Sequence, residues 1–164
     1  MIVIREATPA DVPTLIEMRL ALEGEGHAAP LDPPLRKAVA DWFGRHVGDP
    51  SFAGWVVEEK GQVVAVGGIV LISRPPYTGN RSGQEGLVTS MYTLPDRRDR
   101  GLGGQLLQAM IRDARRRGIG RLVLYSSTGA RSLYRRFGFT DDQERGTPME
   151  LWLDEDSGRT GLPG

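Results

Sequence analysis

A short glycine-rich stretch at residues 98–104 carries residue types that can bind phosphate. It reads Arg-Asp-Arg-Gly-Leu-Gly-Gly and follows a β-prone segment that ends at Thr93. Where a strand leads through glycines into a helix, several backbone N–H groups are left unpaired at the positive end of the helix dipole. Glycine lets a diphosphate approach the backbone, and the arginines add charged donors. The stretch therefore predicts an anion site.

Two common phosphate-binding loops do not fit this stretch. A Walker loop requires Gly-Lys-Ser/Thr, whereas Gly104 is followed by Gln105 and Leu106. A dinucleotide-binding fingerprint requires a third glycine at the position that Leu106 occupies. Taken alone, the glycines belong either to another phosphate-binding motif or to an ordinary turn beside solvated arginines.

A second motif, at residues 127–139, reads Ser-Thr-Gly-Ala-Arg-Ser-Leu-Tyr-Arg-Arg-Phe-Gly-Phe. Together the two stretches resemble the GNAT superfamily, the acetyl-CoA-dependent N-acetyltransferases. The family's Val-x-Pro-x-x-Arg/Gln-x-x-Gly-x-Gly/Ala motif corresponds here to Thr93, Pro95, Arg98, Gly101 and Gly103. With serine in place of the usual asparagine, its Asn-x-x-Ala-x-x-Leu-Tyr-x-x-x-Gly-Phe motif corresponds to Ser127, Ala130, Leu133, Tyr134, Gly138 and Phe139.

The resemblance implies that acetyl-CoA binds as the acetyl donor and that no metal ion takes part. The residues implied to contact the coenzyme are Met91, Tyr92, Thr93, Arg98, Asp99, Arg100, Gly101, Leu102, Gly103, Gly104, Gln105, Ser127 and Arg131. Residues 98–104 would hold the pyrophosphate, and residues 91–93 would present backbone groups to the pantetheine arm. The N–H of Tyr92 is the candidate for polarising the thioester carbonyl.

By the same resemblance, Tyr134 occupies the position of the general acid that protonates the departing thiolate. The alternative for Tyr134 is a packed helix aromatic whose hydroxyl reaches solvent. The general base is open. Glu23 and Glu25 follow the first helix and border the acceptor site in this family, and a water chain is a further alternative.

Glu85 is the other candidate base, because it begins the strand that leads to the glycine loop. Strand alternation would place Glu85, Leu87, Thr89 and Met91 on one face, which could look into the amine site. As with the other carboxylates, the alternative is a surface residue without a catalytic role.

The elements that position these residues follow from hydrophobic periodicity and from turn residues. A helix is expected after its N-cap Thr8 until residues 24–26, and others over residues 33–48, 103–117 and 130–136. Strands are expected at residues 2–5, 52–59, 62–72, 86–93, 121–126, 137–139 and 149–153. This order predicts an α/β (α+β) fold. The resemblance implies a mixed, mostly antiparallel sheet splayed between two parallel central strands, with helices on both faces.

Length and composition fit one domain over residues 1–153, which by the resemblance is an acetyltransferase domain, followed by a disordered tail at residues 154–164. The 21 basic residues equal the 21 acidic ones, so no net field favours nucleic acid or a membrane surface. With no cysteine and two histidines, a metal centre is not expected. Without a signal peptide or a spanning run, the expected location is cytoplasmic. A homodimer is compatible with the resemblance.

The expected function is transfer of an acetyl group from acetyl-CoA to a primary amine, that of a small molecule. Acetylation of a protein or peptide amine is one alternative, and a non-catalytic acyl-CoA-binding module is another. The acceptor would be selected by the loops at residues 23–31, 73–84 and 141–148, which carry no diagnostic motif.

Overall fold

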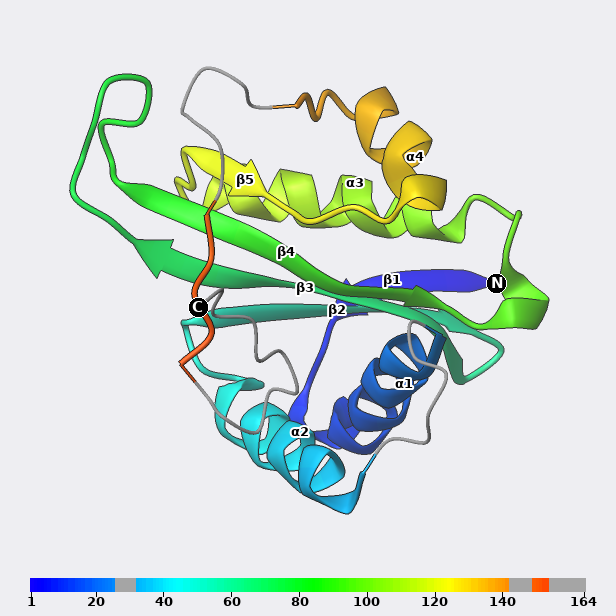
Figure 1. Ribbon diagram of the computed structural model, residues 1–164. Coiled ribbons are helices and arrows are strands. Elements are labelled where there is room, and N and C mark those ends of the chain that lie inside the picture. Colours follow the sequence, from blue (N-terminus) through cyan, green and yellow to red (C-terminus); the bar gives the residue numbers. More distant parts are fainter. Residues whose placement is uncertain (26–31, 142–148, 154–164) are drawn as a thin grey trace. The chain divides into compact units, whose positions relative to one another are not determined.

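A computed structural model describes residues 1–25, 32–141 and 149–153 of the chain (Figure 1). The chain divides into two compact units, Met1–Arg131 and Ser132–Gly164. The expected tail and most of two expected acceptor loops lie outside the described residues. Within the described ranges, no helix is long and apolar enough to cross a lipid bilayer. The prediction of one domain over residues 1–153 stays a prediction.

The first unit holds a sheet that has five strands within the described residues, in the order β1-β2-β3-β4-β5. The β4–β5 pair is parallel, and the other neighbours are antiparallel. The strands are β1 (Ile2–Glu6), β2 (Phe52–Glu59), β3 (Gln62–Ser73), β4 (Gln84–Thr93) and β5 (Arg121–Val123). The helices and short 3₁₀ turns are η1 (Pro9–Asp11), α1 (Val12–Glu25), α2 (Pro33–His46), η2 (Pro95–Arg97), α3 (Leu102–Arg116), η3 (Thr128–Ala130) and α4 (Arg131–Arg136). The predicted mixed, mostly antiparallel sheet is confirmed.

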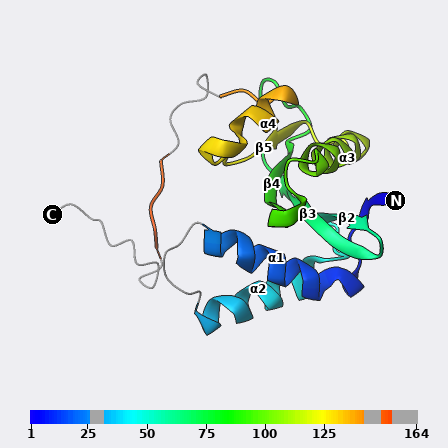
Figure 2. The ribbon, with the colours of Figure 1, turned by 90° about the vertical axis from the view of Figure 1, so that its right-hand side faces the viewer.

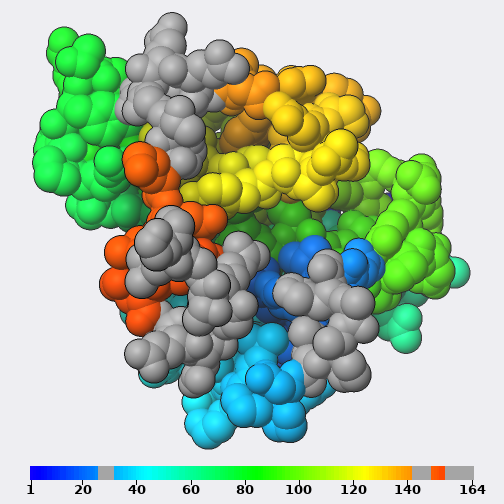
Figure 3. Space-filling model, viewed as in Figure 1, coloured from blue at the N-terminus to red at the C-terminus, as the bar shows by residue number. Residues whose placement is uncertain are grey.

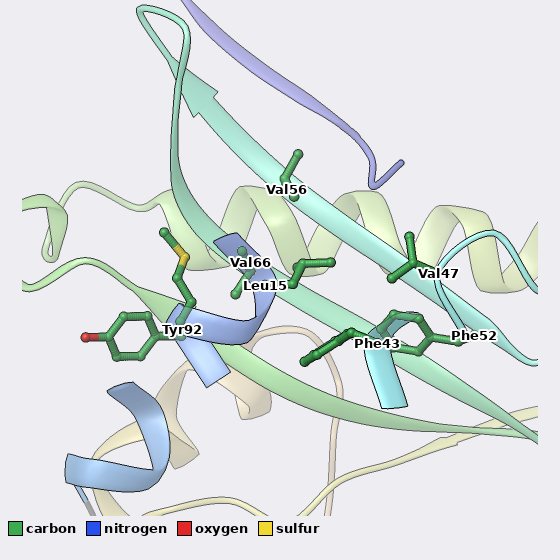
Figure 4. Packing of buried hydrophobic residues seen from close by; sticks show 8 residues of the cluster. Leu15, Phe43, Val47, Phe52, Val56, Val66 and Tyr92 are labelled. Atoms are coloured by element: carbon green, nitrogen blue, oxygen red, sulfur yellow. The ribbon is translucent and has the colours of Figure 1, made fainter. Parts of the chain in front are cut away.

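Helices cover both faces of the sheet. The ribbon views show α1 and α2 on one face and α3 on the other (Figures 1 and 2). Between the sheet and the α1–α2 layer lies a cluster of buried side chains, drawn in Figure 4: Leu15, Met18, Phe43, Val47, Phe52, Val56, Val66 and Tyr92. On the opposite face, α3 buries its apolar stripe, led by Leu106, Leu107 and Met110. Burial of this apolar surface is the main force that holds the layers together.

Local sequence explains where α1 and the β2–β3 hairpin begin. The carboxylate of Asp11 accepts hydrogen bonds from the N–H and the hydroxyl of Thr8, at 2.7 and 2.9 Å, which caps the start of the helix. In the hairpin, Lys60 and Gly61 both have positive φ, at 52° and 78°, as a type I′ turn requires. The sequence predicted Thr8 as the N-cap and a strand on each side of Lys60 and Gly61, and the hydrogen bonds from Thr8 to Asp11 were not predicted.

Three expected strands differ from the structure. β5 ends at Val123, three residues before the predicted end. The expected strand at residues 137–139 is a turn, because Phe137 and Phe139 N–H donate to the carbonyl of Tyr134 and Gly138 adopts a φ of 91°. Residues 149–153 have no regular structure. A β-prone composition does not produce a strand where no neighbouring strand supplies hydrogen bonds. In the described sheet no strand lies beyond β5, which is therefore its edge.

Candidate functional site

The two ends of β4 differ in their pairing with β5. The parallel ladder joins Glu85, Gly86 and Leu87 to Arg121, Leu122 and Val123 and stops there. β4 continues to Thr93, and the residues after β5 lie at the surface of the view in Figure 3. We call residues 85–87 the closed end of β4 and residues 88–93 its open end. The predicted separation of the two strands is confirmed, and their pairing ends at Leu87.

A β-bulge interrupts β4 at its open end. Val66 pairs with Tyr92 and Gly68 with Thr89, so that both Ser90 and Met91 lie opposite Gly67. Ser90 adopts a φ of 55°, which is unusual for a residue with a Cβ. Such bulges redirect side chains and main-chain groups, and they are common beside functional sites.

The bulge separates Met91 from the face that strand alternation had assigned to it. Thr89 lines a pocket with residues of α2, whereas Met91 packs toward α3: a Cβ built on Gly67 would lie 2.5 Å from Met91 Sδ and 3.0 Å from Met110 Sδ. Glu85 shares the face of Thr89 by alternation. The expectation that Glu85 and Met91 share one face is therefore wrong, because one extra residue reverses the alternation.

The same register decides which main-chain groups face the open edge. Leu94 N–H donates to the carbonyl of Val64 on β3 at 3.0 Å. In an antiparallel ladder, residues two apart bond to the same neighbour, so the N–H of Tyr92 also points to β3. The N–H groups of Met91 and Thr93 consequently point away from β3, to the edge that β5 has left. The Tyr92 N–H thus points to β3 and the Met91 N–H to the open edge, and which of the two polarises a ligand stays a prediction.

The glycine loop leads from β4 into α3 with unpaired main-chain donors. Asp99 and Gly101 both adopt left-handed conformations, with φ of 59° and 74°. Gly101 is the N-cap of α3, and the first helical bond runs from Gln105 N–H to its carbonyl at 3.1 Å. Within the described part of the chain, the N–H groups of residues 102–104 have no acceptor. Together with the helix dipole, these donors are what an anion site requires, and the anion site itself stays a prediction.

The arginines of the loop are held by carboxylates from elsewhere in the first unit. Arg100 makes a two-pronged contact with Glu59, at 2.6 and 3.2 Å, and Arg97 Nε donates to the same carboxylate at 3.0 Å. The Arg100 hydrogen bond is the largest cause that lowers the pKa of Glu59. Two of the three arginines thus shape the loop, and its backbone N–H groups remain the free donors.

The third arginine, Arg98, fastens the loop to the open end of β4. Its Nε donates to the carbonyl of Thr93 at 3.0 Å, and its Nη2 bonds Glu25 at the end of α1. Its guanidinium carbon lies 5.4 Å from the centre of the Tyr92 ring, whose hydroxyl points away from the core cluster in Figure 4. Burial, followed by the Glu25 charge, raises the pKa of Tyr92. Arg98 therefore joins the loop, β4 and α1 at one point.

Glu85 lies at the closed end in a saturated environment. Its side chain is 3% exposed, and it accepts hydrogen bonds from Tyr77, from Arg74 at 3.2 Å and from Arg121 at 3.4 Å. The Tyr77 hydrogen bond, against the effect of burial and with help from the two arginines, lowers the pKa of Glu85. A carboxylate with a lowered pKa is a weak proton acceptor, and Glu85 lies roughly 20 Å along the strand from Met91.

The second predicted motif begins in the first unit and ends in the second. Ser127, before η3, is exposed, and its carbonyl accepts from Ala130 N–H at 3.2 Å. Arg131 is the exposed first residue of α4. Within the second unit, Tyr134 packs edge to face on Phe139 at 5.8 Å, and burial raises the pKa of its hydroxyl. A general acid must carry its proton at neutral pH, and the raised pKa of Tyr134 is compatible with this. The role assigned to Tyr134 stays a prediction.

A pocket of about 210 Å³ lies on the α1–α2 face of the sheet, beside the bulge. Its lining comes from α1, α2, β3 and β4: Arg19, Val39, Trp42, Phe43, Val70, Thr89 and Ser90. Sequence reasoning missed this pocket, because its residues come from four separate elements and form no motif. The apolar stripe of α2 was the one signal in the sequence, and such a stripe is equally typical of a helix that packs on the hydrophobic core.

Comparisons with known proteins identify a matching family and similar solved structures. A model of the acetyltransferase (GNAT) family matches residues 17–139. A predicted acetyltransferase from Clostridium acetobutylicum, solved with acetyl-CoA, is 30% identical, with a TM-score of 0.82 over 93% of this chain and 97% of that one. A GCN5-related N-acetyltransferase from Ralstonia eutropha JMP134 is 27% identical, with a TM-score of 0.76 over 91% and 99%. A search of curated proteins found no match.

Proposed function

The chain belongs to the acetyltransferase (GNAT) family, and on this premise we propose that it transfers the acetyl group of acetyl-CoA to a primary amine of a small molecule. The proposal depends most on one observation. Main-chain donors without protein acceptors at the start of α3 adjoin the open end of β4. A long ligand with a phosphate group at one end and an extended arm can use both features at once.

The pyrophosphate of the coenzyme would accept hydrogen bonds from the N–H groups of residues 102–104. Several unpaired N–H groups at a helix N-terminus suit a diphosphate, because they carry partial positive charge and have no intrahelical acceptor to give up. Among the described residues, no further atom lies within 4 Å of a Cβ built on Gly101, so they leave the approach to the loop open. Arg98 and Arg100, whose side chains are 41% and 45% exposed, add positive charge beside it.

The pantetheine arm would lie along the open end of β4, where β5 no longer pairs. Its amide groups would take the place of a neighbouring strand at the N–H and C=O groups of the exposed edge. The thioester carbonyl would then accept a hydrogen bond from the Met91 N–H, which the bulge turns toward that edge. This assignment replaces the one made for Tyr92 from the sequence.

The reaction forms a C–N bond and breaks a C–S bond. The neutral amine attacks the thioester carbon, the Met91 N–H stabilises the negative charge that develops on the carbonyl oxygen, and the coenzyme leaves as a thiolate. Tyr134 would give its hydroxyl proton to that thiolate. The amine loses one proton to solvent through a base, and the Tyr134 phenolate takes one proton back from solvent, so that the products are the amide and the coenzyme thiol.

Glu85 is unsuited to be that base, because its distance from Met91 and its lowered pKa both oppose the role. Of the other carboxylates, Glu25 bonds Arg98 at the open end, and Glu23 bonds Arg19 in the pocket wall. We assign proton removal to this group of residues on α1 or to water that reaches it, and we assign Glu85 to holding β5 against β4.

Isothermal titration calorimetry with acetyl-CoA tests the donor half of the proposal. We expect a micromolar dissociation constant, about −8 kcal/mol, and a loss of at least about tenfold, near 1.4 kcal/mol, in Gly103→Trp because the indole would fill the phosphate position. Gly44→Trp is the matched control, since Gly44 lies on α2 with no atom within 4 Å of its added Cβ. Absence of binding by the unmodified protein would defeat the proposal.

Release of coenzyme A in the presence of amines tests the transfer half. Free amines are compared with lysine-containing peptides at equal concentration. Turnover of peptides alone would favour a protein acetyltransferase, and binding of the coenzyme with no turnover on either class would favour a non-catalytic module.

A further inference from the structure

We propose that the pocket beside Ser90 selects an acceptor amine that also carries a carboxylate and an apolar side chain, as a free apolar amino acid does. This inference rests on the proposed acetyl transfer and specifies its second substrate. It follows from three properties of the pocket: its apolar wall, the arginine in its described lining, and its position next to the bulge.

The apolar wall is built from α2 and β3. Trp42 and Phe43 pack edge to face at 5.2 Å, and Val39 and Val70 complete the surface. Trp42 is fixed in place, because its ring also stacks on His46 at 4.2 Å and meets Phe52 edge to face at 5.0 Å. A rigid wall of this kind suits a flat or branched hydrocarbon group.

The cation is Arg19, on α1. Its Nη2 bonds Glu23, one turn further along the helix, and a guanidinium carries five N–H donors. Within the described residues, Glu23 is the acceptor that Arg19 contacts, so Arg19 has further donors to offer a ligand. A carboxylate is the planar two-oxygen group that fits them.

The arrangement of charges also matches a zwitterion. Arg19 lines the pocket and its partner Glu23 lies one turn further along α1, so a positive and a negative group lie close together here, and an amino acid carries the opposite two. The carboxylate would meet Arg19, and the ammonium group, before it loses its proton, would lie within the field of Glu23. A phosphorylated sugar would need more positive charge, and apolar walls give its hydroxyl groups no partners.

The size and position of the pocket fit the same substrate. A volume of about 210 Å³ is below that of typical pockets for drug-sized ligands, which favours a molecule of amino-acid size. Thr89 and Ser90 line the pocket and directly precede Met91. In an α-amino acid, one carbon joins the amine to the carboxylate, so a molecule anchored at Arg19 can present its amine to a thioester held at the bulge.

The test compares matched pairs of acceptors that differ in the carboxylate alone: phenylalanine against phenethylamine, and leucine against isoamylamine. We expect kcat/KM to be at least about tenfold higher for each amino acid, which corresponds to about 1.4 kcal/mol. Arg19→Gln should remove this preference mainly through KM, and Arg19→Lys should keep part of it. Arg36→Gln is the control, because Arg36 is an exposed arginine of α2 that pairs with Glu17 outside the pocket.

Quenching of tryptophan fluorescence by phenylalanine gives a second readout that does not depend on turnover, since the ligand would contact Trp42. Equal use of the amino acids and their decarboxylated partners, or an unchanged preference in Arg19→Gln, would overturn this inference. Turnover confined to peptides or to glucosamine 6-phosphate would overturn it as well and leave acetyl transfer intact. Failure to bind acetyl-CoA would instead defeat the proposed function, and this inference with it.

Discussion

The closed and open ends of β4 belong to one strand but are built for different tasks. At the closed end, β5 completes the ladder, and Glu85 is buried among Tyr77, Arg74 and Arg121. At the open end, the ladder stops, a bulge turns Ser90 into a left-handed conformation, and the main-chain edge is left to other partners. The strand is therefore satisfied by protein at one end and available to a ligand at the other.

This contrast shows how a sheet can bind an extended ligand without losing its order. An unpaired strand edge is a liability, because it offers hydrogen-bonding groups to any passing chain. Here the unpaired segment is short, and a charged cluster anchors β5 just before it. Arg98 fastens the far side by bonding both Thr93 and Glu25. The opening thus has a fixed boundary on each side.

The largest expected effect is a loss of stability, without a loss of coenzyme binding, when Glu85 at the closed end is replaced. Glu85→Gln removes the buried charge that accepts hydrogen bonds from Tyr77, Arg74 and Arg121, and hydrogen bonds to a charged group are worth about 1.5–3 kcal/mol. Urea denaturation should show this loss in the free energy of unfolding, while the dissociation constant for acetyl-CoA stays unchanged. A normal stability with a collapsed kcat would mean that Glu85 is the catalytic base after all.

Tyr134→Phe addresses the proposed protonation of the departing thiolate. The variant keeps the ring packing on Phe139 and removes the proton donor, so kcat should fall on the order of 10²-fold, with affinity for acetyl-CoA unchanged. Steady-state kinetics on a verified acceptor and calorimetry measure the two quantities. An unchanged kcat would remove Tyr134 from the mechanism and leave it a packing residue.

The pH dependence of stability sharpens the description of the closed end. The folded protein lowers the pKa of Glu85 below its usual 4.5. A lowered pKa stabilises the fold above pH 4.5, and this contribution is lost as the pH falls through the folded value. The stability difference between the wild type and Glu85→Gln should therefore shrink when denaturation is repeated below pH 4.5. A difference that stays constant across this range would show that the Glu85 charge contributes nothing.

The smallest effect concerns the bulge. Because Ser90 has a φ of 55°, a β-branched residue there should cost about 1 kcal/mol, and glycine should be neutral or slightly stabilising. Thermal unfolding of Ser90→Val, Ser90→Gly and the neighbouring control Thr89→Val measures this. Equal behaviour of the two valine variants would argue that Ser90 is an ordinary strand residue in solution.

The sequence predicted the features of the site that depend on short local patterns. Gly101 and its neighbours indicated a strand–loop–helix transition, and Lys60-Gly61 indicated a hairpin turn, because both depend on conformations that glycine favours. The bulge at Ser90 could not be predicted, because the sequence of β4 is equally compatible with a regular strand. One extra residue in the strand reverses the face of the sheet on which Met91 lies.

Features that depend on distant partners were also beyond the sequence. Glu59 meets Arg100 and Glu25 meets Arg98 across separations of 41 and 73 residues. The apolar segments at residues 137–139 and 149–153 looked like strands, but β-propensity alone does not supply a hydrogen-bonding neighbour.

Hydrogen–deuterium exchange of single backbone amides, with and without coenzyme A, tests the central claim most directly. The account predicts that bound coenzyme slows exchange at Met91 and at residues 102–104, whose N–H groups have no acceptor among the described residues. The amides of residues 85–87, at the closed end, should exchange at the same rate in both states. Binding of coenzyme A that leaves Met91 and residues 102–104 unprotected would contradict the account.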